Sequence, residues 1–294
     1  MLTGLLQQSV ISGLTTGCVY AIVGICVVLI FKSARFPDFA QGTWIVLGGM
    51  LGASFFARGL PLWLSMILAV LSTALLGAAC WIVFLHGPMK RGMSGLHLCM
   101  ITVGLAMGIA AVLQMTIGTR SMSLPPFAKI EPIHLSKVTI SPQAPWLWLT
   151  LLLTMFGLVF LFNHTYWGKQ IRACHQRHLG AILIGLNPSR IAIFIYAFAA
   201  GLAGILGVAM AGMIPVVYHR GTSLILMGFI VYLVGGATSL PGAVIAGLAI
   251  GLIESLTAAF ISTNYMDIVP LSITIVFLLF RPTGLFGESE PGEK

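Results

Sequence analysis

Charged residues are scarce in this chain, and acidic residues are the scarcest of them. Only 7% of the 294 residues are Asp, Glu, Lys or Arg, and only seven residues are acidic. Hydrophobic residues make up 58% of the chain, and the mean hydropathy is +1.03. Because a soluble domain carries about a quarter of its residues as charges, this composition excludes a soluble globular fold and predicts a polytopic membrane protein.

The common signatures of enzymes and metal sites are also missing. The five cysteines form no CxxC pair, so neither a disulfide framework nor a zinc site is indicated. The sequence contains no GxxxxGK[ST], HExxH or GxSxG motif, which argues against an enzyme and against a nucleotide site in this chain. His175 and His178 could hold a metal, but a solvated basic surface is favoured. We therefore expect no cofactor and no metal in this chain.

Apolar runs long enough to cross a bilayer recur along the chain, since a helical span needs about 20 apolar residues. We predict an all-α polytopic membrane protein with about eight to nine transmembrane helices, broken or re-entrant segments and a weak internal repeat. Residues 1–287 are expected to form one transmembrane domain, followed by a polar tail at 288–294. The approximate spans are 9–31, 41–57, 62–86, 95–117, 146–163, 191–213, 223–237, 242–262 and 267–280.

The basic residues divide unequally between the two sets of connections, and the richer set is expected in the cytoplasm. This places the N-terminus outside and the C-terminus inside. The loop 118–145 is then external, where its prolines and alternating apolar residues predict an extended or hairpin segment. The loop 164–190 is cytoplasmic. The richer set holds Lys32, Arg35, Lys90, Arg91, Lys169, Arg172, Arg177, Arg190 and Arg281, and the poorer set holds Arg58, Arg120, Lys129, Lys137 and Arg220.

Glycine and proline interrupt the apolar runs at two places, 36–42 and 235–242. Broken helices at matching places in two halves are typical of a transport path. The segments 13–50 and 201–236 also resemble each other weakly, although loops at ordinary helix boundaries would explain both breaks equally well. Small residues spaced four apart predict close helix packing. They occur at Gly13 and Gly17, Gly104 and Gly108, and Gly247 and Gly251.

The polar segment 167–190 is unusual in such an apolar chain. It carries Lys169, Arg172, Arg177 and Arg190 with no acid, and it then becomes amphipathic. This pattern predicts a short helix at the cytoplasmic face that docks on a soluble partner.

Glu254 lies more than one helical turn inside an apolar span. A charge facing lipid is costly, so Glu254 must face the protein interior. With no second acid or basic partner evident inside the spans, we predict a structural role for it, protonated or hydrogen-bonded. Gln41 in the first break is predicted either to contact the solute or to cap the following helix.

Several blocks together resemble the inner-membrane permease family of branched-chain amino acid ABC importers. They are Gly13-x-x-x-Gly17-x-x-Tyr20-Ala21, Asp38-Phe39-Ala40-Gln41-Gly42, Gly168-x-x-Ile171-Arg172-Ala173, Ala181 with Gly185-Leu186-Asn187, Ala203-Gly204-x-x-Gly207, Gly235-Gly236-x-x-Ser239-Leu240-Pro241-Gly242-Ala243, Gly251-Leu252-x-Glu254 and Phe280-Arg281-Pro282-x-Gly284-Leu285-Phe286-Gly287. Two departures stand out. Asp38 and Gln41 replace the family's Asn and His, and His175, Gln176, Arg177 and His178 stand where the family is usually acidic.

The resemblance implies a permease subunit that pairs with a second, related permease in the bacterial inner membrane. Two cytoplasmic ATPases would bind ATP and Mg²⁺, and a periplasmic binding protein would deliver the solute. Relatives with this signature also move urea, short amides and aromatic acids, and a stand-alone channel or secondary transporter is the alternative. The implied path residues are Asp38, Phe39, Gln41, Gly42, Ser239, Pro241 and Gly242. The implied ATPase-coupling residues are Gly168, Ile171, Arg172, Ala173, Ala181, Gly185, Leu186 and Asn187.

Overall fold

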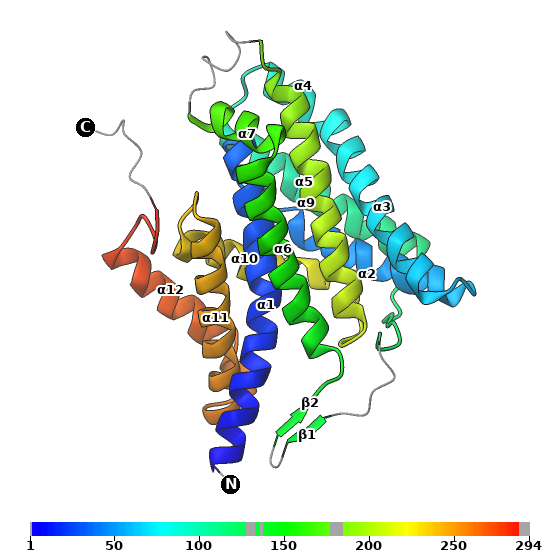
Figure 1. Ribbon diagram of the computed structural model, residues 1–294, viewed down its shortest axis with the longest axis vertical. Helices are drawn as coiled ribbons and strands as arrows, with labels where there is room; N and C mark the ends of the chain where they lie inside the picture. Colours follow the sequence, from blue (N-terminus) through cyan, green and yellow to red (C-terminus); the bar gives the residue numbers. More distant parts are fainter. Residues whose placement is uncertain (1, 128–132, 136–137, 177–184, 288–294) are drawn as a thin grey trace.

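The computed structural model describes residues 2–127, 133–135, 138–176 and 185–287, and Figure 1 shows it as an elongated bundle of helices. The polar tail 288–294 lies outside the described residues. The helices are α1 (Leu2–Ala34), α2 (Gln41–Ala57), α3 (Leu62–Cys80), α4 (His86–Lys90), α5 (Gly95–Thr116), α6 (Ala144–His164), α7 (Tyr166–Gln176), α9 (Pro188–Ala211), α10 (Arg220–Gly235), α11 (Leu240–Phe260) and α12 (Ile268–Phe280).

The described residues contain seven helices that are long and apolar enough to cross a membrane, which confirms the all-α polytopic class. They are Gly4–Ala34, Leu62–Lys90, Gly95–Thr116, Ala144–His164, Pro188–Ala211, Leu240–Phe260 and Thr263–Phe280. Two further predicted spans are shorter helices, α2 with 17 residues and α10 with 16. At about 1.5 Å per residue, such helices fall short of a full bilayer core. This length fits the predicted broken or re-entrant segments.

The predicted hairpin in the loop 118–145 is also present. Strand β1 (Ile133–Leu135) pairs antiparallel with β2 (Val138–Ile140). The Gln8 side chain fixes the hairpin to α1, because it donates to the Thr139 carbonyl at 3.1 Å and accepts from the Thr139 amide at 3.0 Å. Figure 1 places this hairpin and the start of α1 at one end of the molecule, with α7 at the other.

The internal repeat is confirmed as two groups of three helices, α1–α2–α3 and α9–α10–α11. Their packing is reciprocal: α1 packs on α11 as α9 packs on α3, and α1 packs on α10 as α9 packs on α2. Helix α1 starts at the end of the molecule that carries the hairpin, whereas α9 starts at the opposite end, which carries α7 (Figure 1). The two groups therefore run in opposite directions. Inverted repeats of this kind are common in transporters.

Small residues allow the closest helix contacts in the repeat. A Cβ atom on Gly17 of α1 would lie 2.8 Å from the Leu248 Cα of α11, and one on Gly13 would lie 2.9 Å from the Leu252 Cα. Close packing at these glycines is therefore confirmed. The same prediction for Gly104 and Gly108 is wrong within this chain, since no atom lies within 4 Å of either added Cβ. These two glycines instead line an apolar cavity of about 490 Å³ beside α5.

Candidate functional site

The starts of α2 and α10 meet inside the molecule, and the two helices lie near the middle of its long axis (Figure 1). Each helix has glycine then threonine at its second and third positions, Gly42-Thr43 in α2 and Gly221-Thr222 in α10. The two glycines are in direct contact. A Cβ on Gly42 would overlap the Gly221 carbonyl oxygen, and a Cβ on Gly221 would lie 3.0 Å from the Thr43 Cα. Two helix N-termini, each with a partial positive charge, therefore face the protein interior here.

The break that leads into α2 is filled by its own side chains. Asp38 is 1% exposed and Gln41 is 0% exposed. The Asp38 carboxylate accepts from the Ala40 amide at 2.9 Å and from the Gln41 Nε2 at 2.8 Å, while the Gln41 Oε1 is buried without a hydrogen-bond partner in the described structure. Asp38 thus satisfies the start of α2. The predicted role of these two side chains in the path stays a prediction, since neither reaches open space in this structure.

Phe39, another predicted path residue, lines a cavity. Its ring packs against Phe229 of α10 with centroids 5.0 Å apart. Together with Thr43, His219 and Thr222, Phe39 lines a cavity of about 450 Å³ between α5 and the starts of α2 and α10. We call it the Phe39 cavity. Residues from the starts of both α2 and α10 therefore line the Phe39 cavity.

The break that leads into α10 was missed by the sequence analysis, which assigned these residues to a span and its loop. Residues 212–219 run between α9 and α10 and are fixed from both sides. Val216 pairs with Met122 through two backbone hydrogen bonds of 2.7 and 3.0 Å. The Gln143 side chain packs against Gly212, where it donates to the Ala209 carbonyl at 3.0 Å. The repeated Gly-Thr at 42–43 and 221–222 is the signal that could have revealed this break.

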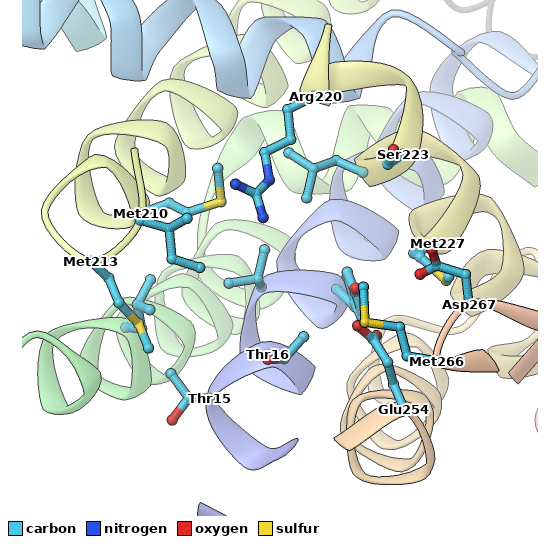
Figure 2. A pocket seen from close by; sticks show the side chains of 15 residues that line it. Thr15, Thr16, Met210, Met213, Arg220, Ser223, Met227, Glu254, Met266 and Asp267 are labelled. Carbon is cyan, nitrogen blue, oxygen red and sulfur yellow. The ribbon is translucent and has the colours of Figure 1, made fainter. Parts of the chain in front are cut away.

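A second cavity, of about 310 Å³, lies on the other side of α10. Arg220 of α10, Glu254 of α11 and Asp267 just before α12 point into it (Figure 2). The sequence analysis counted Arg220 among external-loop charges, but the structure places it in this cavity at the start of α10. We call the space the Arg220 cavity. The cavity mixes charge of both signs with hydroxyl and methionine side chains.

The predicted path residues at the second break, 239–242, do not join Phe39. Ser239 caps α11, because its Oγ accepts from the Gly242 amide at 3.0 Å. The turn is held by the C-terminal segment, where the Leu285 amide donates to the Val234 carbonyl at 2.7 Å. Pro241 is an exposed residue in the first turn of α11. The Ser239 turn therefore serves α11, and the partner of the first break in the repeat is the segment 212–219.

Helix α7 contains most of the predicted coupling residues that the structure describes. Gly168 packs on the backbone of α6, and Ile171 is 1% exposed, so these two residues fix α7 to its own chain. Arg172 is exposed and Ala173 is half-buried. Ala181 lies outside the described residues.

The segment that follows leads directly into α9. Gly185 is exposed with φ +83°, and no atom lies within 4 Å of an added Cβ. Leu186 is half-buried. Asn187 caps α9 by accepting from the Arg190 amide at 3.4 Å. The exposed residues of these two segments are thus available at the end of the molecule that carries α7.

A family model described as branched-chain amino acid transport system / permease component matches residues 9–278. The chain belongs to this permease family. Curated relatives include the high-affinity branched-chain amino acid permease LivH of Salmonella typhimurium, 26% identical over 96% of each chain. They also include BraD of Pseudomonas aeruginosa, 24% identical over 96% of each chain, and a probable LivH of Methanocaldococcus jannaschii, 24% identical over 88% of this chain and 85% of that one.

The fold of this permease also resembles a solved structure. The structure named PsaBC from Streptococcus pneumoniae in complex with Fab matches with a TM-score of 0.51 and 14% identity, over 95% of this chain and 92% of that one. At this identity the likeness supports the fold alone. Taken with the seven long apolar helices, the family establishes a multi-pass membrane permease of a transport system.

Proposed function

We propose that the chain is the transmembrane permease subunit of an ATP-driven importer for branched-chain amino acids or a related small amphipathic solute. The family match over residues 9–278 carries this proposal. The inverted repeat supports it, because two opposed helix starts at Gly42 and Gly221 give a protein interior where backbone groups can meet a solute.

The importer needs partners that this chain does not supply. We propose a second, related permease, two cytoplasmic ATPases that bind ATP and Mg²⁺, and a periplasmic solute-binding protein. Helix α7 is the proposed contact with an ATPase. Its buried residues fix it to α6 and α9, while Lys169 and Arg172 are exposed three residues apart on one face. A helix that is fixed to its own chain and has an exposed basic face can bind an acidic groove of an ATPase and pass the movement of that groove to α6 and α9.

The decisive experiment measures ATP hydrolysis by the assembled complex in lipid vesicles. The complex is purified through a tag on this chain, and leucine is supplied with its binding protein. We expect co-purification of an ATPase and hydrolysis that rises with solute. A chain that moves solute alone, with no ATPase attached, would instead establish a stand-alone channel or secondary transporter.

Arg172→Glu tests the coupling surface. Reversing one interfacial charge should lower solute-stimulated hydrolysis and transport about tenfold or more, because close charge pairs at an interface have coupling energies of about 1.5 kcal/mol upward. Lys90→Glu is the matched control, since Lys90 is an exposed cation in α4, at the same end of the molecule. Equal losses in both variants would show a general effect of charge and remove α7 from the proposal.

We also propose a bacterial inner-membrane location, with the N-terminus outside and the C-terminus in the cytoplasm. Single cysteines at Arg172 in α7 and at Asn264, in the connection between α11 and α12, probe segments at opposite ends of the bundle (Figure 1), and both positions are exposed. An impermeant thiol reagent added to intact cells should label residue 264 and spare residue 172. The reverse pattern would invert the orientation.

A further inference from the structure

The Arg220 cavity holds three charged groups that do not neutralise one another. The Arg220 guanidinium donates only to the Pro215 carbonyl, at 3.4 Å, and it forms no ion pair within 4.0 Å in the described part of the chain. The Oε2 atom of Glu254 is buried and has no hydrogen-bond partner there. Removing a charge from water without a partner is costly. In the described structure, Arg220 therefore lacks an anionic partner and Glu254 lacks a cationic one.

The position of the three groups gives the cavity a direction. Asp267 is exposed, and it lies between the end of α11 and the start of α12. Glu254 is half-buried further along α11, and the Tyr20 side chain of α1 lies beside it. The exposed Ile214 also borders the cavity, from the segment 212–219. The cavity thus reaches the surface of the described structure beside Asp267 and Ile214.

The remaining wall is apolar and adaptable. Figure 2 shows Met210 beside Arg220, Met213 further off toward Thr15, and Met227 and Met266 nearer the acids. Methionine side chains are flexible and polarisable, so they pack against aliphatic groups of varied shape. A space of about 310 Å³ is at the small end of ligand pockets, as an amino-acid-sized solute requires.

We propose that the Arg220 cavity binds the transported solute as a zwitterion with an aliphatic side chain. The Arg220 guanidinium receives the carboxylate, Glu254 receives the ammonium, and the methionines pack on the side chain. Asp267 attracts the ammonium at the mouth of the cavity. This inference rests on the proposed function, which supplies an amino acid as the solute. It places that amino acid on one side of α10. Urea and short amides carry no full charges, so they would leave these groups unpaired.

Adjacent residues of α10 provide a matched pair of probes. Ser223 lines the Arg220 cavity and Thr222 lines the Phe39 cavity, and both are exposed. Each is replaced by cysteine in the assembled transporter, without ATP, and its modification by a small thiol reagent is followed at that residue. Protection is measured within each variant, as the modification rate with leucine against the rate without it, so the comparison does not depend on unchanged transport. We expect leucine to slow modification at Ser223→Cys about tenfold and to leave Thr222→Cys unchanged.

Analogues and one variant then identify the groups that bind. The analogues are 3-methylbutylamine, which is leucine without its carboxylate, and 4-methylpentanoate, which is leucine without its ammonium. Each should protect Ser223→Cys about tenfold less well than leucine, since each lacks one of the two charged groups that form charge-assisted hydrogen bonds. Adding Arg220→Gln should weaken leucine roughly tenfold and leave 3-methylbutylamine unchanged.

Three results would overturn the inference. Protection of Thr222→Cys alone would place the solute in the Phe39 cavity. Protection by urea or acetamide without protection by leucine would exclude a zwitterion. Protection of neither cysteine, in a complex that transports leucine, would show that the solute binds in neither of the two cavities beside α10. In this last case the proposed function stands, whereas a complex that hydrolyses ATP without transporting any amino acid contradicts the proposed function itself.

Discussion

The two breaks of the inverted repeat have the same backbone plan and opposite chemistry. The break before α2 is sealed, because Asp38 and Gln41 are buried and hydrogen-bond to each other. The break before α10 is open, because Arg220 faces a cavity with no anionic partner within 4.0 Å in the described structure. The two meet at Gly42 and Gly221.

This difference assigns separate tasks to two similar segments. A buried polar group that forms its hydrogen bonds within its own segment fixes the geometry of a helix start, and removing it lowers the stability of the fold. An unpartnered charge beside a cavity contributes little to the fold and is available to a ligand. The first break should therefore respond to mutation through assembly, and the second through transport.

The largest effect is expected where the two breaks touch. Gly42→Ala places a Cβ onto the Gly221 carbonyl oxygen, and the backbone of α10 cannot move aside cheaply. We expect a loss of about 3 kcal/mol or more in stability, seen as low yield and a lower melting temperature of the complex. Gly108→Ala is the control, because it meets no atom within 4 Å and should be neutral or slightly stabilising. Normal melting of the Gly42→Ala complex would mean that the two helix starts are not in contact.

The next comparison sets Asp38→Ala against Arg220→Gln. Asp38→Ala leaves the Ala40 amide and the Gln41 side chain without their acceptor, so stability should fall by about 2 kcal/mol. Arg220→Gln should leave the melting temperature within a degree or two and lower leucine transport at least roughly tenfold. Melting and transport measured on both complexes check the pair. The reverse assignment, with Asp38→Ala stable but inactive, would place the working charge in the first break.

Glu254 sharpens the comparison within the Arg220 cavity. The sequence alone predicts that Glu254→Gln keeps transport, because an amide preserves size and hydrogen bonding. The cavity and its charges change this expectation. We now expect Glu254→Gln to assemble normally and to raise the leucine KM about tenfold, through loss of the ammonium partner. An unchanged KM together with poor assembly of Glu254→Leu would restore the purely structural role.

The smallest effect is expected at Gln41. Gln41→Ala removes the 2.8 Å hydrogen bond to Asp38 and also an unpartnered buried oxygen, and these two changes oppose each other. The net loss should stay below about 1 kcal/mol, with leucine kinetics unchanged. A selective change in KM among solutes would show that Gln41 reaches the path.

Local pattern was enough to predict the class of the protein and much of its outline. The apolar runs predicted the spans, the alternation in 118–145 predicted the hairpin, and glycine with proline at 36–42 predicted the first break. These features depend on residues close together in the chain, because the period of a helix or strand and the preferences of glycine and proline act locally.

The sequence by itself thus determined an all-α membrane permease with a broken second span and a weak repeat. Only the tertiary structure decided that the repeat joins α1–α3 to α9–α11, and that Arg220, Glu254 and Asp267 share one cavity. The sequence analysis did not group Arg220 with Glu254, because Arg220 is 34 positions away and looked like a loop residue. Helix packing alone brings such residues together, since side chains distant in sequence acquire a common environment only when their helices fold against one another.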